Sequence, residues 1–387
     1  MVEHATTAKL HVLTLTPFYP SNGDEVSGCF VAETLQEIKH QGVTSSVFAV
    51  DSIYHAKRRP SPHSPAEWIR YPQLPGNFGL SIAGRFLTAV LVRKVRQLHE
   101  RSPLHLIHAH AALPCGHAAA LLSERLNIPF VVTIHGLDVF NCCFQNGMAS
   151  RWRRKTSLSV YESARKVVCI SNKVQELLGN GMDRIASEVV YNGTDPNLFA
   201  PGPAPDQNPT ILIVGNLLVG KGHELVLNAF ARIRHLCPGL TISMIGDGAD
   251  RDRFAALAEN LGIRDQVHFH GRLGRSEVAE AMRRCTVFVL PSRFEGLGCV
   301  YLEAMACAKP VIACRGQGIE EIIRHDDNGW LIPVDGLEEL VNGLQALLND
   351  SALRARLGQA ARKTILDKLT LAHQAEILTD IYEEAAR

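Results

Sequence analysis

The strongest fold signal in this chain is TVFVLPSRFEGLGCVYLEAMACAKPVIAC, residues 286–314. The stretch begins and ends in short apolar runs, which are typical of strands buried on both faces of a parallel sheet. Between them a loop carries Glu295, Gly296 and Gly298, and the glycines let backbone amides approach a ligand closely. Glu303 follows inside the predicted helix. The order of strand, loop, helix and strand predicts an α/β unit whose ligand site lies at the carboxyl ends of the strands.

Strand and helix patterns alternate along the rest of the chain. Residues 10–16, LHVLTLT, predict a first buried strand, and a helix pattern follows, with Ser27 as its predicted N-cap. Similar units lie on both sides of residues 201–209, PGPAPDQNP, whose prolines and missing periodicity predict a linker. We therefore expect an α/β protein of two Rossmann-like domains that face an inter-domain cleft. Three segments result: residues 1–200, residues 201–366, and a C-terminal helix over residues 367–387 that packs across the domains.

The composition is that of a globular protein. The 387 residues are 46% hydrophobic and 20% charged, which excludes a disordered or fibrous chain. Because 40 Lys and Arg residues balance 39 Asp and Glu residues, the net charge does not favour nucleic acid as a partner. Residues 1–15 have the pattern of neither a signal peptide nor a spanning helix, so we expect a cytoplasmic protein. The cysteines, including the adjacent Cys142 and Cys143, lack CxxC spacing and are predicted to be reduced thiols.

The spacing of Glu295 and Glu303 resembles the E-x7-E motif of glycosyltransferase family 4, whose members share the GT-B fold and retain the donor's anomeric configuration. The resemblance implies that the C-terminal half binds a nucleotide-sugar donor and the N-terminal half binds the acceptor. It assigns the donor sugar to Glu295 with Gly296, Leu297 and Gly298, and the ribose hydroxyls to Glu303. A solvated glutamate on a surface helix is the simpler interpretation of Glu303 taken alone, but the motif's context favours the binding role.

A second block, ILIVGNLLVGKGHELVLNAF, spans residues 211–230 and predicts a strand, a turn and a helix that begins just after Lys221. A cation beside free helix amides suits a diphosphate leaving group, on which negative charge grows as the glycosidic bond breaks. Family members commonly carry an arginine where this chain has Asn216, which can still donate a hydrogen bond to phosphate. The block is not a Walker loop, because GxxxxGK[ST] is absent. We predict donor binding by Gly215, Asn216 and Lys221, with Lys221 as the catalytic stabiliser of the leaving group.

Three smaller segments complete the predicted site. In residues 131–140, VVTIHGLDVF, a strand leads to His135 and Asp138. By resemblance, His135 is catalytic and orients a sugar hydroxyl, whereas general-base action is less favoured because the leaving phosphate can take the acceptor's proton; Asp138 lies on the acceptor side. The loop at residues 17–30 places Gly28 at a helix start near the donor phosphates, although its glycines also suit a simple turn. The strand end expected near the base pocket contains Gly271, Arg272 and Leu273.

These segments predict a retaining glycosyltransferase that moves a sugar from a nucleotide-sugar, with UDP favoured and GDP open. The acceptor is a glycan, a lipid-linked molecule or a small molecule, in bacterial polysaccharide or glycoconjugate synthesis. No DxD-type cluster is placed to bridge a diphosphate, so we expect neither a metal nor another cofactor. A dehydrogenase is disfavoured because the first strand and helix lack GxGxxG. The alternative is a non-catalytic nucleotide-sugar sensor or partner subunit. The best support for it is Asn216, which stands where the family commonly has arginine.

Basic segments in the N-terminal half leave two interpretations open. Residues 80–101 combine an apolar stripe with five arginine and lysine residues, and residues 151–155, RWRRK, add more basic charge. A basic amphipathic helix can dock on anionic lipid, which suits a lipid-linked acceptor and a peripheral position at the inner face of the cytoplasmic membrane. An ordinary helix packed on its sheet, with a solvated polar face, explains the same pattern.

Overall fold

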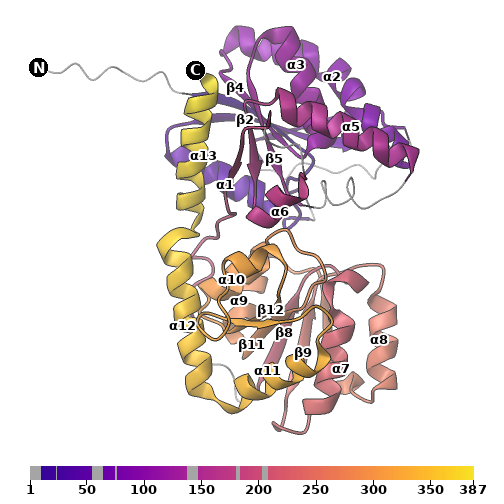
Figure 1. Ribbon diagram of the computed structural model, residues 1–387, viewed down its shortest axis with the longest axis vertical. Helices are drawn as coiled ribbons and strands as arrows, with labels where there is room; N and C mark the ends of the chain where they lie inside the picture. The colour runs from indigo at the N-terminus through magenta and orange to yellow at the C-terminus, as the bar shows by residue number, and fades with distance from the viewer. Residues whose placement is uncertain are drawn as a thin grey trace, which may run out of the picture. The chain divides into compact units, whose positions relative to one another are not determined.

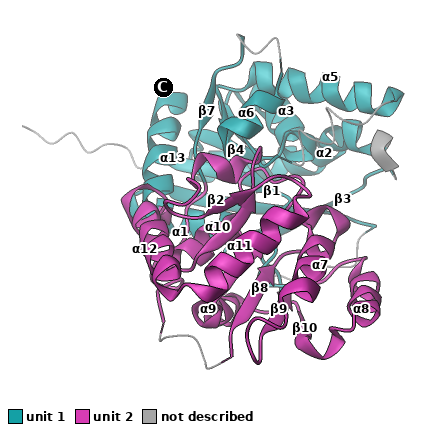
Figure 2. Ribbon diagram, turned by 60° about the horizontal axis from the view of Figure 1, so that its bottom comes forward, with its two compact units in different colours: residues 1–191, 372–387 teal, residues 192–371 magenta. Residues whose placement is uncertain are grey.

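The computed structural model describes residues 10–22, 24–54, 64–74, 76–136, 147–179, 184–202 and 208–387. The chain forms two compact units, residues 1–191 with 372–387, and residues 192–371 (Figure 2). Each unit is built on one parallel sheet. The predicted α/β class is confirmed in both units.

In the first unit, the residues of β1 are all buried, as the sequence predicts. Val12 of β1 lies opposite Ser45 on one neighbouring strand and Leu106 on the other. The chain order reverses at β1 and β4, so the loops that follow these two strands lie at the point where doubly wound sheets bind ligands. Among the described residues the order across the sheet is β3 (Ala66–Tyr71), β2 (Thr44–Ser52), β1 (His11–Thr16), β4 (Leu106–His110), β5 (Phe130–Ile134), β6 (Lys166–Cys169) and β7 (Ser187–Val189).

Helices cover both faces of this sheet (Figure 1). On one face lie α2 (Gly76–Arg101), α3 (His117–Leu126) and α5 (Met148–Ser163), with the π-helical segment η1 (Ala112–Gly116). On the other, α1 (Cys29–His40) and α13 (Leu371–Ala386) share one apolar core with the strands. Thr34 Oγ1 of α1 donates to Gln374 Oε1 of α13 at 3.1 Å. The predicted C-terminal helix thus packs on the first sheet, and the short α6 (Asn172–Leu177) follows β6.

The second unit repeats this plan with six described parallel strands. Their order is β10 (Val267–Gly271), β9 (Thr241–Ile245), β8 (Thr210–Val214), β11 (Val287–Leu290), β12 (Val311–Cys314) and β13 (Trp330–Ile332). One group of helices comprises α7 (His223–Ile233), α8 (Arg251–Asn260) and α11 (Leu337–Asn349), and the other comprises α9 (Arg275–Arg284), α10 (Cys299–Ala306) and α12 (Ser351–Lys368) (Figure 1). The order reverses at β8 and β11, which places the loops after these strands side by side.

The units divide at Tyr191 and Asn192, ahead of the predicted linker at residues 201–209. Residues 203–207 of that linker lie outside the described part of the chain. Asn192 Nδ2 donates to Cys299 Sγ at 3.2 Å, and Phe199 is fully buried. These contacts hold the segment before the prolines within the second unit, so the domain boundary differs from the predicted one.

The eight cysteines that the structure describes are free thiols, while Cys142 and Cys143 lie outside the described residues. No helix in the described ranges is both long and apolar enough to cross a membrane.

Candidate active site

The turn after β8 places Lys221 beside the start of α7. Lys221 ends a 3-10 turn, η3 (Val219–Lys221), and Gly222 follows as the N-cap of α7 with a φ of 78°. A Cβ at Gly222 would lie 2.2 Å from the carbonyl oxygen of Pro291, so the close approach to the loop after β11 requires glycine. The first amides of α7 have no acceptor within the helix. They and Lys221 therefore form one positively polarised corner at the carboxyl edge of the sheet.

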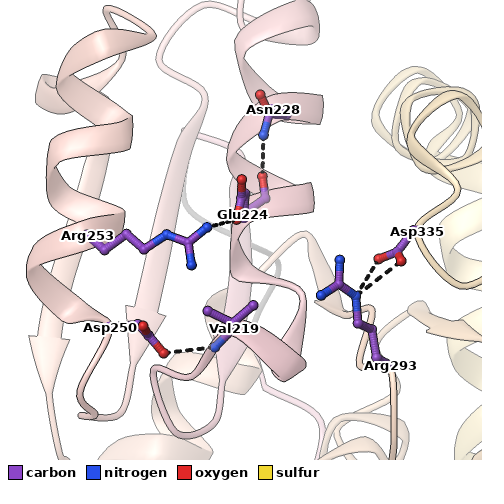
Figure 3. Close-up of polar contacts among 7 residues, drawn as sticks. All are labelled: Val219, Glu224, Asn228, Asp250, Arg253, Arg293 and Asp335. Atoms are coloured by element: carbon purple, nitrogen blue, oxygen red, sulfur yellow. Dashed lines mark hydrogen bonds and ion pairs between the residues drawn. The ribbon is translucent and has the colours of Figure 1, made fainter.

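Neighbouring side chains hold this turn in place (Figure 3). Asp250 Oδ2 accepts a hydrogen bond from the N–H of Val219 at 3.0 Å. The backbone N–H of Arg293, in the loop after β11, donates to the carbonyl oxygen of Gly220 at 2.9 Å. The Nε of Arg293 in turn donates to Asp335 Oδ1 at 2.8 Å. The backbone that carries Lys221 is thus fixed from two sides.

Lys221 and Glu295, two predicted catalytic residues, meet in the second unit. Lys221 Nζ lies 2.6 Å from Glu295 Oε2, and the side chains are 25% and 16% exposed. The N–H of Glu295 donates to Gln317 Oε1 at 3.0 Å, and the N–H of Gly318 donates to the carbonyl oxygen of Glu295 at 3.1 Å. Loops after three adjacent strands therefore position one cation and one carboxylate together.

The glycine loop of the motif leads directly into α10. Gly298 is the N-cap, with a φ of 81°, and a Cβ there would lie 2.6 Å from the ring of Tyr301. Gly296 precedes Leu297, whose side chain is fully buried. The Leu297 side chain therefore belongs to the core, and only its backbone is available for the predicted donor contact.

Glu303 lies inside α10 and is 4% exposed. Its Oε1 accepts a hydrogen bond from Nη1 of Arg275, the first residue of α9. The interpretation as a solvated surface glutamate is therefore wrong, because this carboxylate is buried and paired.

The remaining donor-side residues lie along the carboxyl ends of β8 and β10. Gly215 directly follows β8, and Asn216 after it is exposed. Gly271 has a φ of 71° and accepts a hydrogen bond from the N–H of Gly246 at 2.8 Å. Arg272 beside it is exposed. A cavity of about 300 Å³ lies nearby and is lined by Asn208, Thr210, Leu212, Ser243, Ile245, His270, Leu273, Ala281, Arg284 and Cys285.

His135 follows β5 in the first unit and lies in an aromatic cage. Its ring stacks on His110 with centroids 5.3 Å apart, and His110 Nδ1 lies 3.0 Å from His135 Nε2. The rings of Phe18 and Phe30 lie 5.4 Å and 5.0 Å away. Burial lowers the pKa of His135 to about 4, so the ring is neutral near pH 7. A neutral imidazole can donate and accept hydrogen bonds, but with this pKa it is a weak base.

Gly28 belongs to the same neighbourhood as His135. It is the N-cap of α1, with a φ of 79°, so the predicted Ser27 cap is wrong. A Cβ at Gly28 would lie 2.3 Å from the carbonyl carbon of Phe18, and this close approach selects glycine. The backbone of Phe18 thus touches the start of α1 while its ring contacts His135. Asp138 lies outside the described residues.

Two family profiles match the chain, one in each half. Residues 28–198 match the family described as Glycosyltransferase Family 4, and residues 195–364 match Glycosyl transferases group 1. An uncharacterized glycosyltransferase of Methanocaldococcus jannaschii is 32% identical over 272 residues, which are 69% of this chain and 72% of the relative. The chain belongs to glycosyltransferase family 4. The N-acetyl-alpha-D-glucosaminyl L-malate synthase of Bacillus anthracis is 29% identical over 72% of the transferase and 74% of its own length.

Solved structures share the fold of the transferase over nearly its full length. Sucrose-phosphate synthase from Thermosynechococcus elongatus has a TM-score of 0.76 at 21% identity, covering 97% of the transferase and 98% of that chain. Anabaena HepE in complex with UDP and glucose also has a TM-score of 0.76, at 20% identity, covering 97% of the transferase and 100% of that chain. The predicted GT-B fold with two Rossmann-like domains is confirmed.

The structure also shows polar residues near His135 that the sequence motifs did not indicate. His108 Nδ1 lies 2.6 Å from the Tyr382 hydroxyl, and its Nε2 lies 2.7 Å from Thr133 Oγ1. Burial, with a smaller contribution from His135, lowers the pKa of His108 to about 3. The alternation of His108 and His110 along β4 was the available signal, since side chains two residues apart share one face of a strand. No sequence pattern indicated the partner of Glu303 on α9.

Proposed function

We propose that this transferase moves a sugar from a nucleotide-sugar donor, with UDP as the favoured nucleotide, to an acceptor hydroxyl with retention of the anomeric configuration. The observation that carries the proposal is the pairing of Lys221 with Glu295 at the start of α7. A cation and helix amides suit a diphosphate, and a neighbouring carboxylate suits sugar hydroxyls. The complexes of Anabaena HepE with UDP and glucose and with UDP-glucose support a uridine donor.

The proposed donor contacts follow the carboxyl edge of the second sheet. Glu295 and the amides of residues 296–298 hold the sugar, and Glu303 accepts from the ribose. Gly215, Asn216 and Lys221 bind the diphosphate. The base lies against Gly271, Arg272 and Leu273.

The proposed reaction uses charge that develops as the donor bond breaks. When the bond between the anomeric carbon and the phosphate oxygen lengthens, the sugar becomes cationic and the diphosphate gains negative charge. Lys221 and the first amides of α7 stabilise that charge. The acceptor oxygen bonds to the anomeric carbon on the face that the diphosphate leaves, and the acceptor's proton passes to the departing phosphate oxygen. No side-chain base is required, which agrees with a role for neutral His135 in orienting a hydroxyl.

We propose that this reaction proceeds without a metal ion. Lys221 is the only cationic side chain within residues 215–222, because Asn216 stands where the family commonly has arginine. The described ranges contain no group of three His, Cys, Asp or Glu side chains arranged to hold a metal. The leaving-group charge then rests on Lys221, Asn216 and backbone amides.

A membrane-bound acceptor is favoured by the exposed surfaces of α2 and α5, which pack against each other (Figure 1). Phe86 is 37% exposed on α2 beside the exposed Arg85, and Trp152 is 41% exposed on α5 beside the exposed Arg151. Exposed apolar rings beside basic side chains suit anionic lipid. We propose peripheral docking of this surface on an anionic membrane and a lipid-linked or membrane-associated glycan acceptor.

Sedimentation with lipid vesicles tests the docking proposal. The transferase should sediment with phosphatidylcholine vesicles that contain phosphatidylglycerol and not with phosphatidylcholine alone, and Trp152→Ser should weaken the binding. Equal sedimentation with both kinds of vesicle, or with neither, contradicts the proposal.

The melting temperature with UDP, GDP and ADP tests the donor. A nucleotide at 100 times its Kd stabilises the folded state by about 2.7 kcal/mol, which corresponds to a rise of roughly 5–10 °C for a unit of this size. A shift with one nucleotide names the base, and no shift with any of them at saturation contradicts the proposed function. Release of the nucleotide from its sugar conjugate in the presence of acceptor then separates a transferase from a non-catalytic sensor.

A further inference from the structure

Arg275 lies at the N-terminus of α9, where the helix dipole disfavours a positive charge. It is the first residue of α9, at the positive end of the helix dipole. The same turn contains Glu277, whose Oε2 accepts from the N–H of Gly274 at 2.8 Å and caps the helix. Contacts outside α9, among them those with Glu303 and Phe199, offset this unfavourable position of Arg275.

Glu303 is a carboxylate that folding has removed from water. Its side chain is 5% exposed and that of Arg275 is 16% exposed. A buried carboxylate stays ionised only where cations or hydrogen-bond donors replace the lost water. The contact with Arg275 Nη1 uses one of about four lone-pair positions of the carboxylate. Glu303 therefore keeps the capacity to accept hydrogen bonds from hydroxyl groups.

The guanidinium group of Arg275 lies over the ring of Phe199. The guanidinium carbon lies 4.7 Å from the centroid of the Phe199 ring, and this ring is fully buried. A planar guanidinium stacks on an aromatic face in a way that an ammonium group does not. The segment at residues 192–199 also contacts the start of α10, because Asn192 Nδ2 donates to Cys299 Sγ at 3.2 Å. One segment thus braces both the helix of Glu303 and its partner.

We propose that Arg275 is a positioning residue of the donor site that makes the transferase select ribonucleotides over deoxyribonucleotides. Arg275 lies over the Phe199 ring and pairs with Glu303, and so orients this carboxylate to accept hydrogen bonds from the 2′- and 3′-hydroxyls of the donor's ribose. The inference rests on the donor role proposed for Glu303 and goes beyond it, because it assigns the ribose preference to an ion pair braced by the 192–199 segment.

Calorimetric titration with UDP and with 2′,3′-dideoxy-UDP tests this assignment. Wild-type protein should bind UDP about 10- to 100-fold more tightly, because the ribose hydroxyls donate to a charged acceptor. Arg275→Met should bind the dideoxynucleotide within about threefold of wild type, yet prefer UDP by less than about threefold. Arg275→Lys, which keeps the charge without the stacking plane, should have an intermediate preference.

Arg283→Met is the matched control. Arg283 lies on the same helix and donates from Nη1 to the carbonyl oxygen of Leu198 at 3.0 Å, but its Nε pairs with Glu280. This variant should keep the full ribose preference. If Arg275→Met is unstable, the double variant with Glu303→Gln removes the unpaired buried charge, and it should recover the melting temperature without recovering the preference.

Three results would overturn the inference, and each has a different meaning. An unchanged ribose preference in Arg275→Met shows that Arg275 does not position Glu303. A wild-type protein that binds UDP and dideoxy-UDP equally contradicts the ribose role of Glu303, while the proposed donor is retained. Failure of UDP, GDP and ADP to bind contradicts the proposed function itself.

Discussion

Replacing Lys221 with methionine removes one charge and keeps most of the side-chain volume. In the structure Lys221 Nζ lies 2.6 Å from Glu295 Oε2, and three-quarters of the lysine side chain is shielded, since it is 25% exposed. A unit charge about 3 Å from a phosphate oxygen contributes roughly 5 kcal/mol at an effective dielectric constant of about 20, before desolvation is counted. Removal of one preorganised donor in other enzymes costs about 3–4 kcal/mol. Lys221→Met should therefore slow transfer by about 100- to 1000-fold.

The assay is the release of UDP from UDP-glucose, or from the sugar nucleotide that stabilises the protein most in the melting screen. The loss should appear in kcat and kcat/KM together, because the stabilised charge develops only in the transition state. Circular dichroism should show a folded variant, since Glu295 keeps the backbone contacts to Gln317 and Gly318.

Arg232→Met is the matched control for charge loss on the same helix. Arg232 lies in the last turn of α7, is 48% exposed and pairs with Glu338. Its removal should change the rate by less than about twofold, because exposed ion pairs contribute little. A Lys221→Met variant that retains more than about a tenth of the wild-type rate would refute the assignment of Lys221 to the leaving group.

Three further outcomes are expected. Because burial lowers the pKa of His108 to about 3 and of His135 to about 4, the unfolded chain takes up protons below about pH 6.5 before the folded chain does. The free energy of unfolding should therefore fall as the pH drops from 6.5 toward 4, by about 2 kcal/mol per histidine at pH 5; equal urea midpoints at pH 8 and pH 5 would contradict this. Turnover should persist in EDTA, and a loss that Mg²⁺ or Mn²⁺ restores would show that a metal takes part. Asn216→Arg should tighten UDP binding by about fivefold in calorimetry, through one more charge-assisted contact at an exposed position, and weaker binding would show that Asn216 does not face the diphosphate.

The parallel strands were predictable because burial on both faces leaves a continuous apolar run. β11 shows this directly, since its four residues, VFVL, are all apolar and all buried. The start of α1 and the boundary between the two units were less predictable from the sequence than the strands. The start of α1 depends on the approach of the Phe18 backbone to Gly28, and the unit boundary depends on the burial of Phe199, and neither contact leaves a local pattern.

The candidate site was predicted as a set of residues but not as a set of contacts. Motif spacing indicated Lys221, Glu295 and Glu303, yet it did not indicate that the first two are paired. The contact between His110 and His135 was also missed. His135 follows β5, which is the neighbour of β4 in the sheet, and the two histidines are 25 positions apart in the chain.

The amino-acid pattern alone specifies the buried strands, the glycines of the tight turns and the polar groups that follow the strands, because these depend on residues close in sequence. The tertiary structure determines which of these polar groups come into contact. Lys221 and Glu295 are 74 positions apart and meet because β8 and β11 are neighbours in the sheet. Arg275 and Glu303 are 28 positions apart and meet because α9 packs against α10, where burial leaves each charge dependent on the other.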